Sequence, residues 1–285
     1  METQKSEIQK LMIFHGKPTD LLPLADGRNV RTDPITGALT AGINGLTVSI
    51  PKGSDLNILA HKLLIAAVAA FTKTNSKGCI GNTSVSLDIR RFITLCGVNV
   101  SSKPSVDKAK RQLCAALMTL CAIRLTWTEN GKTAVQYRNV CLIDGESAIR
   151  QGTVNIRFTD EFAKYLVSRP LARYPVSLFA VSGRSPNAYR IGHKLALHNS
   201  NMNNRKIGTA NSLKVSTLLR FTSLPDYVEL RAEHQSWIHK VRKPFESCLA
   251  ALVKIGMIKG WSYKNREIHS YLQFADNVIC FEGIP

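Results

Sequence analysis

Acidic side chains are scarce in this sequence. Its 285 residues include 20 Asp and Glu against 38 Lys and Arg, which gives a formal net charge of +18 and a pI of about 9.8. Such an excess of positive charge is costly to carry unless a polyanion binds to it. Nucleic acid is therefore the first candidate partner, and an acidic membrane surface is the second.

Long hydrophobic runs are also missing. The longest apolar stretch, LLIAAVAAF at 63–71, is far shorter than the roughly 20 residues that a membrane-spanning helix requires. The polar N-terminus, METQKSEIQK, lacks the apolar core of a signal peptide. Because 44% of the residues are hydrophobic, the chain has enough apolar side chains to bury a core. We therefore expect a folded, cytoplasmic protein that does not enter a membrane.

Motifs for metals, nucleotides and catalysis are missing as well. The seven cysteines are scattered and form no CxxC pair, so neither a disulfide framework nor a zinc site is indicated. The sequence contains no GxxxxGK[ST], HExxH or His-x-His motif, which disfavours a P-loop ATPase and a metal-dependent nicking enzyme. We interpret His61 and His193 as structural or phosphate-facing residues. The sequence thus predicts no cofactor, no metal and no catalytic centre.

The first half of the chain has an order of elements typical of a winged helix. Residues 1–53 are rich in Gly, Pro, Thr and Asp and predict an irregular arm with one short strand, NGLTVSIPKG at 44–53. The elements predicted after it are a helix capped by Ser54, a strand and short helix at 84–97 ending at Gly97, a long helix at 102–121 with Pro104 in its first turn, a hairpin around Asn130-Gly131, and a strand and helix at 153–168 capped by Thr159 or Asp160.

The same order returns after a connection near 170–185. AHKL at 60–63 matches GHKL at 192–195, and DKAKRQLCAALMTLCAIRLTWT at 107–128 aligns without a gap with RKPFESCLAALVKIGMIKGWSY at 242–263. The second copy is expected to close with a hairpin around KNREIHSYLQF. We therefore predict an α+β fold of two tandem winged-helix domains related by internal duplication. The predicted parts are an N-terminal arm at 1–53, a first domain at 54–175 and a second domain at 176–285.

Cations concentrate on the outward face of both long helices. A helical wheel places Lys108 and Arg111 away from the core of the first long helix. The second long helix opens with HKVRK, and the wheel turns its basic side chains outward together with Glu246. These basic side chains are His239, Lys240, Arg242 and Lys243. A helix N-terminus already favours anions, so added cations there indicate phosphate binding. Pro244 predicts a kink or a restarted helix.

Further basic residues fit a footprint on DNA. They are Arg90 and Arg91 on the short helix, Lys132 at the first wing tip, Arg205 and Lys206 in the segment NSNMNNRKIGTANS, and Lys264 and Arg266 at the second wing. The alternative is that these lysines and arginines only keep the surface soluble.

The second copy resembles plasmid replication initiators (Rep proteins) of the tandem winged-helix type. The similarity lies in SPNAYRIGHKLALHNSNMNNRKIGTANSLKVSTLL and RKPFESCLAALVKIGMIKGWSY. It implies a protein without enzymatic activity that binds repeated double-stranded sites in a plasmid origin, helps to open the origin and recruits host replication proteins. The C-terminal winged helix would read the major groove, and the N-terminal one would contact DNA or form a homodimer.

The resemblance also assigns roles to residues. It implies base reading by His239, Arg242 and Lys243, and phosphate contacts by Arg205, Lys206, Lys264 and Arg266. Two alternatives stay open: a winged-helix transcription regulator or repressor, and a DNA nicking or recombinase enzyme whose catalytic residues the sequence does not reveal. Tyr165 and Tyr189 are examples of tyrosines that could serve as its nucleophile, but no metal ligands or arginine cluster accompany them in the sequence.

Overall fold

The structure, a computed structural model, divides the chain into two compact units. It describes residues 12–14, 30–32, 38–43, 46–51, 57–75, 80–101, 103–129, 135–168, 171–201, 205–234 and 236–283. The N-terminal unit is Met12–Leu171, and the C-terminal unit is formed by Ala172–Pro285 together with Met1–Leu11. The boundary between the two units lies after Leu171, whereas the sequence predicts a boundary after residue 175. Each unit is described by itself below.

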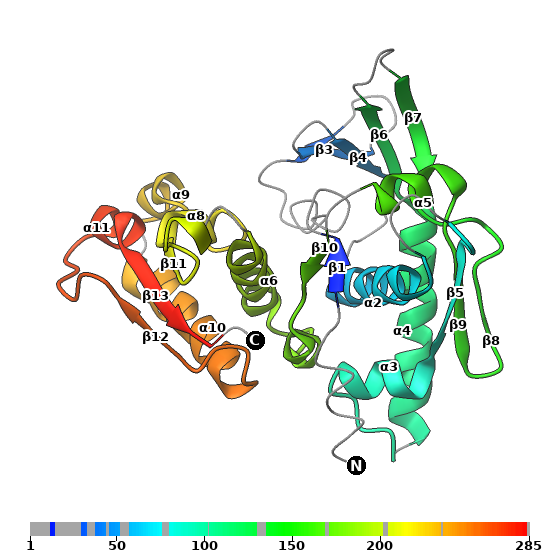
Figure 1. Cartoon of the computed structure of the whole chain (residues 1–285). Helices are drawn as coiled ribbons and strands as arrows, with labels where there is room; N and C mark the ends of the chain where they lie inside the picture. Colours follow the sequence, from blue (N-terminus) through cyan, green and yellow to red (C-terminus); the bar gives the residue numbers. More distant parts are fainter. Residues whose placement is uncertain are drawn as a thin grey trace. The chain divides into compact units, whose positions relative to one another are not determined.

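The N-terminal unit contains two sheets beside a helical core (Figure 1). One sheet has the strand order β2-β3-β4-β6-β7, and the other has the order β5-β9-β8. The elements are β1 (Met12–Phe14), β2 (Val30–Thr32), β3 (Leu39–Ile43), β4 (Leu46–Ile50), α2 (Ile58–Thr74), β5 (Ser84–Asp88), α3 (Ile89–Leu95), α4 (Lys103–Ala122), β6 (Arg124–Glu129), β7 (Val135–Cys141), β8 (Ala148–Arg150), β9 (Thr153–Arg157) and α5 (Asp160–Val167).

The helices of this unit lie close to the positions that the sequence predicts. Helix α2 is buried along most of its length, including His61, and its cap is Asn57, whose side chain accepts a hydrogen bond from the Ala60 backbone N–H. The predicted cap, Ser54, lies outside the described residues. The predicted ends of two other helices are confirmed: Gly97 has a φ of 78° after α3, and Thr159 caps α5.

The hairpin predicted as the wing of the N-terminal unit is present as the antiparallel pair β6–β7. The hairpin β6–β7 does not pair with β5 but joins β4, with Leu46 opposite Trp127 and Val48 opposite Leu125. Burial of Val48, Leu125 and Trp127 stabilises this pairing, because apolar side chains leave water along it. The N-terminal arm therefore contributes strands β2, β3 and β4 to this five-stranded sheet. Of these three strands, the sequence predicts only β4. Lys132 lies outside the described residues.

The strands that pair with β5 form a second, shorter hairpin, β8–β9. Arg150 pairs with Thr153, so the turn has two residues, Gln151 and Gly152, with φ values of 48° and 81°. Positive φ at both central positions is typical of the type I′ turn, whose twist matches that of the strands. This hairpin occupies the position of a wing, because its strand β9 pairs with β5, the strand between helices α2 and α3.

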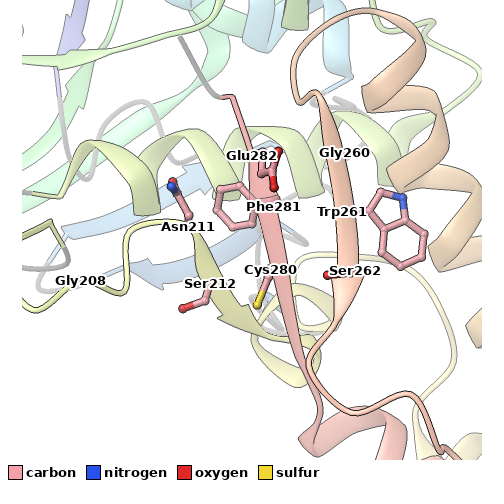
Figure 2. Close-up of a pocket in the computed structure, with 9 residues that line it drawn as sticks. All are labelled: Gly208, Asn211, Ser212, Gly260, Trp261, Ser262, Cys280, Phe281 and Glu282. Atoms are coloured by element: carbon pink, nitrogen blue, oxygen red, sulfur yellow. The ribbon is translucent and has the colours of Figure 1, made fainter.

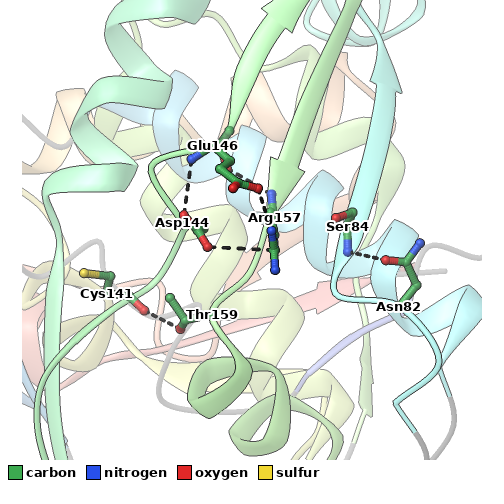
Figure 3. A network of polar contacts seen from close by, with 8 residues as sticks. Asn82, Ser84, Cys141, Asp144, Glu146, Arg157 and Thr159 are labelled. Carbon is green, nitrogen blue, oxygen red and sulfur yellow. Dashed lines mark hydrogen bonds and ion pairs between the residues drawn. The ribbon is translucent and has the colours of Figure 1, made fainter.

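A polar network holds the base of this hairpin (Figure 3). Arg157 on β9 forms ion pairs with Asp144 and Glu146, which precede β8. The hydroxyl of Thr159 donates a hydrogen bond of 2.7 Å to the backbone carbonyl of Cys141 at the end of β7. The ion pairs are solvent-exposed, so their contribution to stability is small, and the network mainly fixes where the hairpin starts.

The C-terminal unit has the winged-helix order of elements. Its sheet has the order β11-β13-β12, in which the first strand lies between two helices and the other two follow the long helix (Figure 1). The elements are β10 (Leu171–Arg173), the 3-10 turn η2 (Val176–Ala180), α6 (Pro186–Ser200), β11 (Ser212–Lys214), α8 (Val215–Leu219), α9 (Tyr227–Ala232), the π turn η3 (Ile238–Arg242), α10 (Lys243–Lys254), β12 (Gly260–Tyr263), α11 (Tyr271–Asp276) and β13 (Val278–Glu282). Both units contain a helix, a strand, a short helix and a long helix in the same order, with α9 inserted before the long helix of the C-terminal unit. The internal duplication stays a prediction.

Helices α6 and α10 pack closely at Gly192. A Cβ atom at this position would lie 2.6 Å from Leu178 Cδ1 and 2.9 Å from both Leu252 Cδ2 and Met257 Sδ. All three neighbouring side chains are fully buried, so they have little room to move aside. The glycine of GHKL is therefore needed for the approach of the two helices.

The predicted interruption at Pro244 is a π turn. The backbone N–H of Lys243 donates to the carbonyl of Ile238, five residues back, and regular helix α10 starts at Lys243. A proline at position 244 has no N–H for the carbonyl of Lys240, and its ring would crowd that carbonyl in a regular helix. Widening the turn before the proline removes this conflict, so the prediction of a restarted helix is confirmed.

The closing segment of the C-terminal unit is not a simple hairpin. Strands β12 and β13 are antiparallel, with Trp261 opposite Phe281, but helix α11 lies in the connection between them. The side chain of Asn277, which is 4% exposed, exchanges hydrogen bonds with the backbone of Asn265. Asn277 thereby closes the loop that carries Lys264 and Arg266.

Candidate nucleic-acid interface

The long helix of the C-terminal unit, η3 with α10, exposes one continuous stripe. Its members are the exposed residues His239, Lys243, Ser247, Ala250 and Lys254. Their spacing of three or four residues places them on one face of the helix. The opposite face buries Val241, Phe245, Leu249 and Leu252 in the core. We call the five exposed residues the outer stripe.

The chemistry of the outer stripe suits a DNA groove. Cationic or titratable side chains stand toward its ends, and the two small side chains, Ser247 and Ala250, lie between them. Small side chains let a helix approach base edges, where a Ser hydroxyl can bind several bases and an Ala methyl packs on the methyl group of thymine. The predicted cations Lys240 and Lys243 are both exposed at the N-terminal part of this helix.

Arg242 differs from its prediction because it is half-buried. Its Nε donates a 2.9 Å hydrogen bond to Oε1 of Glu246, and its guanidinium carbon lies 5.8 Å from the centre of the Tyr263 ring. The Tyr263 hydroxyl donates to the same carboxylate oxygen at 3.2 Å. The hydrogen bond to Glu246 raises the pKa of Arg242, and burial raises the pKa of Tyr263, so both groups keep their protons at neutral pH. Glu246, also predicted to face outward, is half-buried for the same reason.

Two loops of the same unit present further cations. Lys264 and Arg266 are exposed on the connection after β12, where the Lys264 backbone N–H donates to the Val278 carbonyl. Between α6 and β11, Lys206 is exposed, and the exposed Arg205 donates from Nε to the carbonyl of Asn199 at 2.8 Å.

His198 holds the second of these loops against helix α6. Its Nε2 lies 2.9 Å from the carbonyl oxygens of both Thr209 and Ser212. Two carbonyl neighbours require a donor, so Nε2 carries the proton. Sequence reasoning missed this role, which depends on contacts between residues 11 and 14 positions apart.

The N-terminal unit exposes a smaller set of cations. Arg90 and Arg91 on α3 and Lys108 and Arg111 on α4 are all exposed, as predicted, and Lys103 and Lys110 are further exposed cations on α4. The two helices are neighbours in this unit.

The paired histidines His61 and His193 are core residues. They are 0% and 1% exposed, so neither faces a phosphate group. Burial, together with the positive charge of Lys194, lowers the pKa of His193 to about 3. His193 is therefore neutral at physiological pH, and of the two roles left open by the sequence the structure supports the structural one.

An open hollow of about 620 Å³ lies on the sheet of the C-terminal unit (Figure 2). Trp261 and Ser262 of β12 and Cys280 and Glu282 of β13 contribute to its lining. The described residues that line it include no lysine or arginine. Among the described residues, no cluster of three or more His, Cys, Asp or Glu side chains could hold a metal ion. Within the same residues, no helix is long and apolar enough to cross a bilayer.

Comparison with known proteins identifies the fold. No protein-family model matches the sequence, and no curated protein matches it. Among solved structures, the chain is similar to the Pi initiator protein in complex with iteron DNA, with a TM-score of 0.50 and 13% identity over 80% of this chain and 90% of that one. It also matches RctB domains 2–3 (TM-score 0.48, 9% identity, 92% of this chain and 96% of that one) and SeMet derivatives of RctB domain 2 and domain 3 (TM-score 0.47, 10% identity, 93% and 98%).

The comparison with solved structures tests the predicted fold. The match to the Pi initiator protein confirms the mixed α/β winged-helix fold and the resemblance to replication initiators. Sequence identity is too low for the match to assign individual residues.

Proposed function

We propose that this chain is a plasmid replication initiator that binds repeated double-stranded DNA sites at an origin. The observation that carries the proposal is the outer stripe, an exposed face of the long helix in a winged-helix unit, with cations around two small side chains. The fold shared with an initiator whose structure contains iteron DNA supports it. In winged-helix and helix-turn-helix proteins, this helix enters the major groove.

The surrounding cations supply the affinity that does not depend on sequence. Arg205, Lys206, Lys264 and Arg266 lie on the loops of the same unit, where they bind phosphate groups on either side of the groove. Each phosphate neutralised releases counterions into solution, which favours binding at low salt. A net charge of +18 adds long-range attraction that speeds association.

The N-terminal unit makes the second contact in this proposal. Arg90, Arg91, Lys108 and Arg111 bind the DNA backbone in the monomer, and a homodimer is the alternative use of this unit. Bound copies open the origin and recruit host replication proteins. All of these steps are binding steps, so the protein acts without enzymatic activity and without a cofactor.

Footprinting on the DNA that flanks the gene tests the proposal. The full chain should protect several copies of one sequence, and Lys243→Ala should weaken binding to them by roughly 1–3 kcal/mol if the side chain contacts a base. Arg184→Ala, which removes one exposed cation from the same unit outside the long helix, is the matched control and should lose less.

Two other outcomes would favour the alternatives. Protection of a single site in a promoter, with no effect of the gene on plasmid maintenance, would indicate a transcription regulator. Cleavage of labelled DNA by the full chain, lost in Tyr165→Phe or Tyr189→Phe, would indicate a nicking enzyme. Both tyrosines are fully buried, which disfavours the second outcome.

A further inference from the structure

The long helix of the C-terminal unit contains one arginine that is held in place before any DNA binds. Arg242 is fixed at Nε by Glu246, one helical turn further along, and its guanidinium lies over the ring of Tyr263 from strand β12. The Tyr263 hydroxyl donates to the same oxygen of Glu246. The three side chains therefore form a bridge between the groove helix and the wing sheet, which we call the arginine clamp.

The clamp leaves the outer end of the guanidinium available. A guanidinium group has five N–H donors. Glu246 accepts from Nε, and Tyr263 is a second hydrogen-bonding partner, so donors remain on the Nη atoms. The side chain is 28% exposed, so part of it reaches solvent. Arg242 also directly precedes Lys243 of the outer stripe, so its backbone lies next to that face of the helix.

We infer that the arginine clamp aims Arg242 at a guanine base in each DNA repeat, with Glu246 as the positioning residue. The inference rests on the proposed function and adds the base that the helix recognises. Guanine presents two acceptors, N7 and O6, to the major groove, and the parallel donors of a guanidinium match both. The N-terminal part of a groove helix is where base edges are contacted.

The carboxylate of Glu246 is otherwise difficult to explain on this surface. A negative charge on a DNA-binding helix repels phosphate groups, so general electrostatics predicts that its removal strengthens binding to every duplex. If Glu246 aims Arg242, its removal should instead weaken binding to the repeat alone. The two accounts predict opposite signs for the same substitution.

The first experiment maps the base. Duplexes carry one repeat found by footprinting, each with a single guanine replaced by 7-deazaguanine, which lacks the N7 acceptor and still pairs with cytosine. The wild-type chain should lose roughly 10-fold in affinity at one guanine. Arg242→Ala should bind the unmodified repeat more weakly and be insensitive to 7-deazaguanine at that position. The inference is overturned if no guanine couples to Arg242, or if Arg242→Ala weakens binding to all duplexes equally, which would mean a phosphate contact.

The second experiment tests the positioning. Glu246→Gln should lower the ratio of affinities for the repeat and for an unrelated duplex by roughly 10-fold, whereas its binding to the unrelated duplex should strengthen. Glu267→Gln removes the same charge from an exposed residue of the wing connection and should leave the ratio unchanged. An unchanged ratio in Glu246→Gln would overturn the inference.

A third variant guards against misfolding. Tyr263→Phe keeps the ring that packs against Arg242 and removes only the hydroxyl that donates to Glu246. It should lower the ratio by less than Glu246→Gln does, and an unchanged ratio would remove Tyr263 from the clamp. If the wild-type chain shows no preference for any repeat, the proposed function itself fails. If the wild-type chain prefers the repeat but this preference does not depend on Glu246, only the inference about Arg242 fails.

Discussion

His193 couples the stability of the C-terminal unit to pH at the scale of a single residue. Its ring is fully buried beside Tyr174, with ring centres 5.8 Å apart, and burial lowers its pKa to about 3. In the unfolded chain the pKa of a histidine is about 6.5, so the unfolded state binds a proton first as the pH falls. Stability contributed by the neutral ring is therefore full above about pH 6.5 and is lost toward pH 3.

This linkage gives a prediction for the free energy of unfolding. Between pH 7 and pH 5 the wild-type chain should lose about 2 kcal/mol through His193 alone. Urea unfolding at the two pH values measures the loss. His193→Phe keeps a ring beside Tyr174 and should show a pH dependence smaller by that amount, and an equal dependence in both proteins would contradict the assignment.

Arg242 shows how far sequence reasoning reaches at the same scale. A helical wheel turns it outward, whereas in the structure it is half-buried, because the wheel contains only the period of its own helix. Its contact with Tyr263 depends on a strand about 20 residues away, for which the local pattern carries no signal. Of the outer stripe, the sequence predicted His239 and Lys243 to face outward, and it gave no indication of the arginine clamp.

Gly192 sets the distance between two helices at the scale of elements. A methyl group at position 192 would lie only 2.6–2.9 Å from the buried side chains of Leu178, Leu252 and Met257. Gly192→Ala should therefore destabilise the protein by roughly 1–3 kcal/mol, the usual cost of an overpacked core. Chemical denaturation gives the value.

Gly183 provides the matched control for this substitution. No atom lies within 4 Å of a Cβ built at Gly183, and its φ is not in the left-handed region. Gly183→Ala should be neutral or slightly stabilising, since alanine reduces the entropy of the unfolded chain. Equal effects of the two substitutions would show that helix packing does not depend on Gly192.

Helices and sheets differed in how well the sequence predicted them. Helix α4 begins and ends within one residue of its predicted bounds, because its apolar period and Pro104 are local signals. Pairing of Leu46 with Trp127 joins segments 81 residues apart, so the Asn130-Gly131 turn correctly predicted a hairpin but not the sheet that it joins. The turn at Gln151 and Gly152 was the missed signal for the wing-like hairpin.

Net charge acts at the scale of the whole molecule. With +18 on 285 residues, binding to any duplex should weaken steeply with salt, with a slope of about −0.9 per phosphate neutralised in a plot of log affinity against log salt. Replacing both Lys264 and Arg266 by Ala should make the slope shallower by about 2 for repeat and unrelated DNA alike. A salt-independent affinity would contradict DNA binding altogether.

The central claim is that the outer stripe of the long helix enters a DNA groove. Ala250 lies within that stripe and is exposed, so Ala250→Glu keeps the fold but introduces a bulky negative charge at the contact. Ala180→Glu makes the same change at an exposed position outside the helix. Affinity for the footprinted repeat, measured by titration with labelled duplex, is the decisive quantity.

The account predicts that Ala250→Glu lowers this affinity by roughly 100-fold or more, since it adds both steric clash and repulsion to a desolvated contact. Ala180→Glu should lower it by only a few-fold. Equal affinities of the two variants for the repeat would contradict the assignment of this helix to the groove.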